Sequence, residues 1–102
     1  MKKIFVCSPL RGDIQGNQLR AEQYCKYVYQ QGHIPFAPHL FFTRFLNDNI
    51  DEERRFGIAA GMEFLKMMDE CWIFSRNISS GMKAEIDFCR QLGIPVIMKG
   101  DI

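Results

Sequence analysis

The segment NISSGMKAEIDFC, residues 77–89, carries a carboxylate in an unexpected place. Drawn as a helix at about 100° per residue, it puts Glu85 inside the apolar arc, between Leu92 and Cys89, away from the other charged residues. One interpretation is that Glu85 lies at the rim of the helix. The other is that it points into a crevice, where the helix dipole and a ligand's donors would compensate its burial. A carboxylate held there is a candidate nucleophile or base.

The residues just before this glutamate suit an anion. Ser79, Ser80 and Gly81 stand at the expected start of the helix. Free backbone N–H groups at such a start favour a ligand group such as phosphate. The plainer interpretation is ordinary N-capping, for which one serine is enough.

A second polar loop, SPLRGDIQGN, follows the first apolar run of the chain. In it, Ser8 supplies a hydroxyl, Arg11 a guanidinium and Gly12 an accessible stretch of backbone. Alone this loop is a weak signal, because loops after strands are commonly polar. Together, the two loops indicate a ligand site more strongly than either does alone.

Apolar and amphipathic runs predict the elements that must position these residues. Asn17 is the expected N-cap of the first helix and Gly32 its end. Pro35 predicts that the second strand is an edge or a strand start. Acids in the first turn of the second helix favour its dipole. We expect strands at 2–7, 33–37, 71–75 and 94–99 and helices at 17–31, 49–70 and 79–93.

Strands that alternate with helices predict a single α/β domain over residues 1–102. Its mostly parallel sheet of about four strands would be doubly wound, Rossmann- or flavodoxin-like, with helices on both faces. In such sheets, ligands bind outside the carboxyl ends of the strands, at the switch point. The loops 8–16 and 75–81 follow the first and third strands, so they are the natural binding loops.

Composition excludes several classes of function. Of 102 residues, 47% are apolar and 25% charged, which is an ordinary globular balance. The formal charge is +1 and the basic residues form no stripe, so no nucleic-acid partner is expected. No segment approaches the roughly 20 apolar residues of a membrane span, so a cytoplasmic location and no membrane contact are expected.

Four cysteines are spread along the chain and form no CxxC pair. Each falls in an expected strand or on an apolar helix face, which favours buried free thiols. Neither His33 nor His39 has a metal-ligand spacing to any of them. We therefore expect no metal centre and no cofactor.

The stretches IFVCSPLRG and MDECWIFSRNISSGMKAEIDFCRQLGIPVI together resemble the nucleoside 2-deoxyribosyltransferase-like superfamily. That group includes deoxyribosyltransferases and 2′-deoxynucleoside 5′-phosphate N-hydrolases. The resemblance covers the order of elements over nearly the whole chain. It implies that Glu85, in a Gly-x-x-x-Glu element with Gly81, attacks the anomeric carbon of the sugar, and that Ser79 helps to bind a 5′-phosphate. The first-loop pattern of the family is matched by Phe5, Ser8, Arg11 and Gly12.

The sequence departs from the family at two positions. Gly61 stands where the family has an aspartate on the preceding helix, and Lys83 where a second glycine is common. Glycosidic cleavage normally needs an acid to protonate the departing base. The residues that would have to replace the aspartate are His39, Asp13, Tyr24 and Asp69.

Three functions follow as expectations. The resemblance implies an N-glycosidase or deoxyribosyltransferase that acts on a deoxynucleoside or its 5′-monophosphate through a covalent glycosyl-enzyme, as retaining glycosidases do. A non-catalytic nucleotide-binding module, a sensor or sponge, would use the same pocket and would explain Gly61. An interaction protein with a vestigial site is the third.

The segment PHLFFTRFLND, residues 38–48, is aromatic and irregular. A short loop cannot bury so many large side chains in a small monomer, so some are expected to meet another subunit or to line a lid. The alternative is a short helix packed on the sheet. Members of the superfamily are commonly homodimers or larger, and the resemblance thus implies a homo-oligomer. The side chains in question are Leu40, Phe41, Phe42, Phe45 and Leu46.

Overall fold

Four parallel strands form one sheet in the computed structural model, which describes residues 1–102. Their order across the sheet is β2-β1-β3-β4, and every neighbouring pair is parallel. The doubly wound α/β fold expected from the sequence is confirmed, and Pro35 does lie in an edge strand. The strands are β1 (Lys3–Cys7), β2 (Ile34–Phe36), β3 (Glu70–Ile73) and β4 (Val96–Met98).

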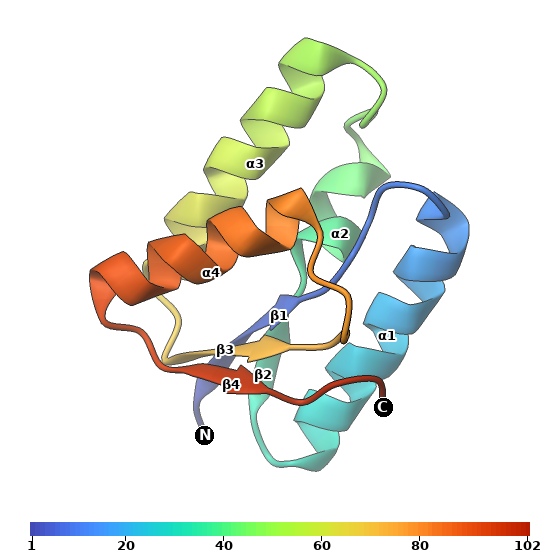
Figure 1. Cartoon of the computed structure of the whole chain (residues 1–102). Coiled ribbons are helices and arrows are strands. Elements are labelled where there is room, and N and C mark those ends of the chain that lie inside the picture. Colours follow the sequence, from blue (N-terminus) through green and yellow to red (C-terminus); the bar gives the residue numbers. More distant parts are fainter.

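Helices cover both faces of this sheet (Figure 1). Helix α1 (Ile14–Gln30) packs on one face, and α3 (Asp51–Leu65) and α4 (Ser80–Leu92) lie over the other. Because side chains alternate along a strand, β1 serves both cores. Ile4 and Val6 pack with Tyr24 and Val28 of α1. The other core consists of Phe5, Cys7, Leu65, Cys71, Ile73, Met82, Ile86 and Cys89.

The chain changes direction between the two central strands. From β1 it winds to β2 on one side, and from β3 it winds to β4 on the other. The two strands are hydrogen-bonded with Cys7 beside Ile73, so the loops that follow them leave the sheet at the same end. This is the switch point, where open α/β sheets bind ligands.

The first helix begins earlier than the sequence indicated. Asp13, not Asn17, is its N-cap, and Asp13 Oδ1 accepts from the Gly16 N–H at 3.1 Å. A Cβ at Gly16 would lie 2.1 Å from Asp13 Oδ2, so a larger residue there would displace the capping carboxylate. Asn and Asp cap equally well, and Gly16 resembles a helix breaker in sequence, so the start was misplaced. Leu19 of this helix is exposed.

The second predicted helix, 49–70, was too long. The observed α3 ends at Leu65, and Glu70 already pairs with Ile4 as the first residue of β3. By contrast, α4 begins and ends as predicted. Ser79 caps it, and Gly93 ends it in the left-handed region at φ 75°.

Three of the four free cysteines, Cys7, Cys71 and Cys89, are fully buried, as predicted, whereas Cys25 is half-buried. No helix of the structure has the length and apolar character needed to cross a membrane.

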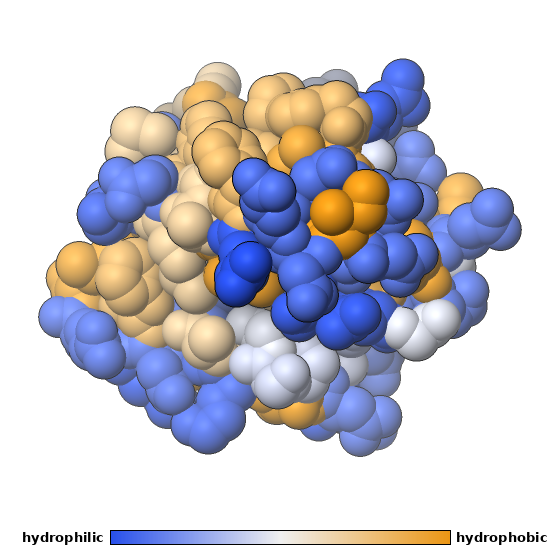
Figure 2. All heavy atoms as spheres, turned by 90° about the horizontal axis from the view of Figure 1, so that it is seen from above, coloured by the Kyte–Doolittle hydropathy of each residue, from blue (hydrophilic) through white to orange (hydrophobic).

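The aromatic segment forms a short helix α2 (Pro38–Phe41) and a 3-10 turn η1 (Phe42–Arg44). Phe42 is buried at the centre of a ring cluster that includes Phe36 and Phe64. Phe41 and Phe45 remain 49% and 60% exposed. Apolar surface gathers on one side of the molecule seen from above (Figure 2). The segment is therefore a packed helical turn that still leaves aromatic surface uncovered.

Candidate functional site

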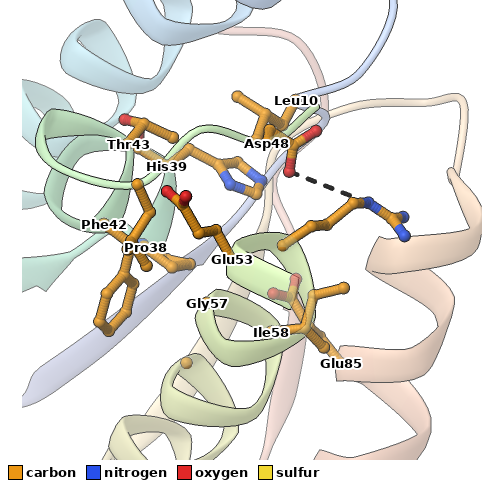
Figure 3. Close-up of a pocket in the computed structure, with 13 residues that line it drawn as sticks. Leu10, Pro38, His39, Phe42, Thr43, Asp48, Glu53, Gly57, Ile58 and Glu85 are labelled. Carbon is orange, nitrogen blue, oxygen red and sulfur yellow. Dashed lines mark hydrogen bonds and ion pairs between the residues drawn. The ribbon is translucent and has the colours of Figure 1, made fainter. Parts of the chain in front are cut away.

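A pocket with two lobes lies where the loops after β1 and β3 meet α3 and α4. The serine lobe, about 310 Å³, includes Ser8, Arg11, Ser79, Ser80 and Gly81. The apolar lobe, about 80 Å³, includes Pro38, Phe42, Leu46, Gly57 and Gly61. Six residues line both lobes and so mark their junction: Leu10, His39, Asp48, Arg54, Ile58 and Glu85. In Figure 3, Glu85 and Ile58 lie on one side of this junction and His39 and Asp48 on the other.

The serine lobe ends on the N-terminus of α4. The Ser79 hydroxyl oxygen accepts from the Met82 N–H at 3.2 Å, so ordinary capping is one of its roles. Its O–H remains free to donate to a ligand, because a hydroxyl both donates and accepts. The N–H groups of Ser80 and Gly81 have no partner within the helix. A Cβ at Gly81 would meet nothing within 4 Å, so this end of the lobe is open.

Ser8 contributes a second unpaired polar group. Ser8 is only 1% exposed, yet its Oγ has no hydrogen-bond partner. Leaving a buried hydroxyl unpaired costs about 1–3 kcal/mol. The Ser8 residue lines the serine lobe, so a ligand there would offer Oγ the missing partner.

Two arginines and an aspartate line the same lobe. Asp48 lies 3.3 Å from Arg11 Nε and 3.9 Å from Arg54 Nε. Asp48 Oδ2 is buried and makes no well-aligned hydrogen bond, so the Arg11 contact is an ion pair rather than a hydrogen bond. Neither Asp48 nor Arg54 was found from the sequence. Asp48 is the last residue of the irregular aromatic segment 38–48, and no pattern there indicated that its side chain would line the pocket.

Asn17 positions the loop that carries Arg11. Its Nδ2 donates to the Leu10 carbonyl at 2.9 Å and more weakly to that of Arg11 at 3.4 Å. Gly12 turns the same loop at φ 98° but does not line either lobe. Its role is therefore to shape the loop.

Glu85 is half-buried and lines both lobes, so it faces the crevice. The helix dipole acts most strongly within the first turn of a helix. Because α4 starts at Ser80, Glu85 lies beyond that turn and gains little from the dipole. Burial raises the pKa of Glu85 from 4.5 to about 7, against an opposing hydrogen bond from Cys7. A carboxyl group that titrates near neutrality in a cleft suits proton transfer or nucleophilic attack.

The floor of the apolar lobe is formed by one face of α3. Arg54, Gly57, Ile58 and Gly61 recur at helical spacing and all line it. Glycine within a helix costs about 1 kcal/mol relative to alanine, so two in one helix call for a reason. A Cβ at Gly61 would lie 3.6 Å from Pro38, which is ordinary contact. The glycines therefore keep the lobe open and are not forced by close packing.

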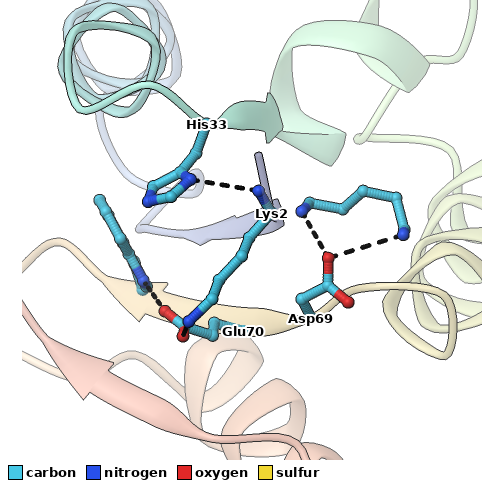
Figure 4. A network of polar contacts seen from close by, with 6 residues as sticks. Lys2, His33, Asp69 and Glu70 are labelled. Atoms are coloured by element: carbon cyan, nitrogen blue, oxygen red, sulfur yellow. Dashed lines mark hydrogen bonds and ion pairs between the residues drawn. The ribbon is translucent and has the colours of Figure 1, made fainter.

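Of the four candidate acids, only His39 lines the pocket. Asp13 is the exposed cap of α1, and Tyr24 stacks on Phe74 beneath α1, on the opposite face of the sheet. Asp69 lies at the other end of the sheet, where it accepts from the Lys3 N–H at 2.7 Å (Figure 4). The structure thus removes Asp13, Tyr24 and Asp69 as acids for this pocket. Lys83, at the second departure from the family pattern, pairs with Asp87 in solvent.

Comparisons with known proteins agree with this fold. The family described as "Domain of unknown function (DUF7768)" matches residues 2–99. A 2-deoxyribosyltransferase from the psychrotolerant bacterium Bacillus psychrosaccharolyticus has a similar structure, with a TM-score of 0.71 and 24% identity. The alignment covers 94% of this chain and 70% of that chain. At this identity the likeness shows a shared fold. No curated protein matches the sequence.

Proposed function

We propose that this chain, which belongs to the DUF7768 family, is an N-glycosidase or deoxyribosyltransferase for a deoxynucleoside or its 5′-monophosphate. The observation that carries the proposal is the position of Glu85 at the junction of the two lobes. A nucleotide has a phosphate at one end, a base at the other and a sugar between them. With phosphate in the serine lobe and base toward the apolar lobe, the sugar reaches Glu85.

The serine lobe suits the phosphate for three reasons. It offers free N–H groups at a helix start, the unpaired Ser8 hydroxyl, and two arginines. The apolar lobe offers Phe42, Leu46 and Ile58 to a flat, weakly polar base. Its small volume favours a base that enters by one edge and keeps the rest in the open cleft.

The reaction follows the retaining pattern. The ionised Glu85 attacks C1′ of the sugar, the C1′–N bond breaks, and its electron pair leaves with the base, which takes up a proton. Water then attacks C1′ of the glycosyl ester, loses a proton and frees both the sugar and the carboxylate. A second base in place of water gives transfer instead of hydrolysis.

The feature of the pocket that fits catalysis least well is its lack of a group that can protonate the leaving base. His39 donates its Nε2–H to the Ser8 carbonyl at 2.8 Å, and burial lowers the pKa of His39. Its neutral ring therefore has no second proton to give. The other carboxyl groups of the apolar lobe are already engaged, Glu53 with the Asn47 N–H and Asp48 with two arginines. A missing general acid costs about 10²–10⁴ in rate, so turnover is expected to be slow. The same shortage favours the second candidate, a module that binds a nucleotide without cleaving it.

The exposed rings of Phe41 and Phe45 support a homo-oligomer as part of this proposal. They continue the ring cluster of Phe42 outward, since Phe41 packs against both Phe42 and Phe45. A second copy would remove these rings from water.

The proposal is tested by incubating the protein with deoxynucleosides and ribonucleosides, each with and without 5′-phosphate, and measuring free base by chromatography. Glu85→Gln is the test variant. Asp87→Asn, which changes a solvent-facing acid on the same helix, is the control. Base release that only Glu85→Gln abolishes supports catalysis. No release from any substrate, with a nucleotide still raising Tm, overturns catalysis and supports the binding module.

A further inference from the structure

Glu85 has one hydrogen-bond partner in the protein, the thiol of Cys7. Cys7 Sγ donates to Glu85 Oε1 at 3.3 Å. No lysine or arginine forms an ion pair with Glu85. Oε2 has no partner and is not among the fully buried unpaired atoms. The two carboxylate oxygens therefore differ, because one is held and the other is accessible.

The sheet fixes the position of this thiol. Cys7 is the last residue of β1 and is fully buried, and its carbonyl accepts from the Phe74 N–H at 2.9 Å. The other acceptor near Sγ is the Met82 carbonyl, at 3.9 Å. The single thiol proton is thus directed to Glu85 at the shorter distance. A group on a strand holds its partner more precisely than one on a loop.

We propose that Cys7 is a positioning residue of the site, whose thiol holds Oε1 of Glu85 and leaves Oε2 to the sugar. Its consequence for turnover rests on the proposed function. The contact itself needs no substrate, so it is tested separately.

Several titratable groups surround Glu85, yet only Cys7 donates to it. Donation from a thiol stabilises the ionised carboxylate, whereas burial opposes ionisation. Removing the thiol therefore leaves burial unopposed and raises the pKa of Glu85 above about 7. The other titratable or charged groups near Glu85 are Cys71 of β3, Cys89 of α4, His39 of α2, Arg11 and Asp48 of the connecting segments, and Glu53 and Arg54 of α3.

The test is the titration of Glu85 in the ligand-free protein, followed by ¹³C NMR of labelled glutamate and assigned with Glu85→Gln. Cys7→Ala is the test variant. Cys89→Ala is matched to it, because it removes another fully buried thiol of the same core that makes no hydrogen bond to Glu85. We expect the pKa of Glu85 to be higher by roughly 0.5–1 in Cys7→Ala and unchanged in Cys89→Ala. Equal titration of Glu85 in both variants, whatever their Tm, overturns the proposal.

Activity then separates this inference from the proposed function. If the wild type releases base, the rise of kcat with pH should move to higher pH in Cys7→Ala, by the same amount as the NMR titration of Glu85. A pH profile of kcat that is the same in Cys7→Ala and in the wild type overturns the positioning role. If the wild type releases no base, the proposed catalysis fails. A titration shift limited to Cys7→Ala would still support the hold of Cys7 on Glu85.

Discussion

His39 donates its Nε2–H to the main-chain oxygen of Ser8 at 2.8 Å, so its one proton in the neutral state is bound to the protein. A carbonyl oxygen only accepts, which fixes the tautomer and leaves Nδ1 as an acceptor. This imidazole lines both lobes, yet it serves to hold α2 against the end of β1.

His39→Gln keeps an N–H donor at this position and tests that role. Base release should fall by less than about tenfold, whereas loss of a true general acid costs a hundredfold or more. Burial lowers the pKa of His39 below 6.5, so the folded protein favours the neutral ring. The stability that the neutral ring provides is therefore lost as the pH falls through the lowered pKa. Urea unfolding should show a difference in the free energy of unfolding between wild type and variant that changes with pH across that range. A difference that stays constant with pH would contradict a stabilising role for the neutral ring.

Glu85 has the opposite pH dependence. Its pKa is raised from 4.5 to about 7, so the folded protein favours the protonated form. Stability is then fully present at acidic pH and is lost as the pH rises through about 7. Glu85→Gln should therefore raise the free energy of unfolding by roughly 2–3 kcal/mol near pH 8 and by little near pH 4. Asp87→Asn provides the baseline, and equal behaviour of the two variants would show that Glu85 is solvated.

Ser8→Ala should separate ligand binding from stability. Its hydroxyl is buried and unpaired, so removal should leave the unfolding free energy unchanged or raise it by up to about 1 kcal/mol. The affinity for a deoxynucleoside 5′-monophosphate should fall, while that for the free nucleoside changes little. Ser75→Ala is the control, because Ser75 is also buried but its hydroxyl donates to the Asn77 carbonyl. Calorimetry that finds unaltered affinity in Ser8→Ala would remove Ser8 from the site.

Gly61→Asp would place a carboxyl group in the apolar lobe beside the junction. A Cβ there fits at 3.6 Å from Pro38, so the backbone has no need to move. If the pocket lacks only an acid, base release should rise by about tenfold or more. Gly57→Asp adds the same group one turn away on the same face and should give no gain. A fall in both variants would indicate that the lobe must stay apolar.

Phe45→Glu tests the uncovered rings. Phe45 is 60% exposed, so the monomer should remain folded with a Tm close to that of the wild type. Sedimentation should show a smaller assembly for Phe45→Glu than for the wild type. Tyr29→Glu, at a 65% exposed ring on α1, controls for added charge. An unchanged mass would remove this surface as an interface. Phe42 is unsuitable for the test, because it is buried and a charge there would unfold the core.

The sequence by itself determined the fold class and the face of α4 on which Glu85 lies. Alternation of strands and helices leaves few topologies, and the 3.6-residue period of α4 assigns each side chain to a face. Ser79 and Gly93 could be assigned as helix ends because capping depends on residues next to each other in the chain. The N-cap of α1 was misplaced for the same local reason, since Asp13 and Asn17 are both good caps.

Only the tertiary structure decided what surrounds Glu85. Cys7 and Asp48 approach the site from a strand and a loop far away in sequence, and their contacts depend on strand order and on the path of residues 38–50. The hydrogen bond that occupies the His39 proton likewise depends on how α2 packs against the end of β1, and the lack of a partner for the Ser8 hydroxyl is seen only in the folded chain. Periodicity reports which way a side chain points. Its partner, and therefore its protonation, depends on distances that the chain acquires only when it folds.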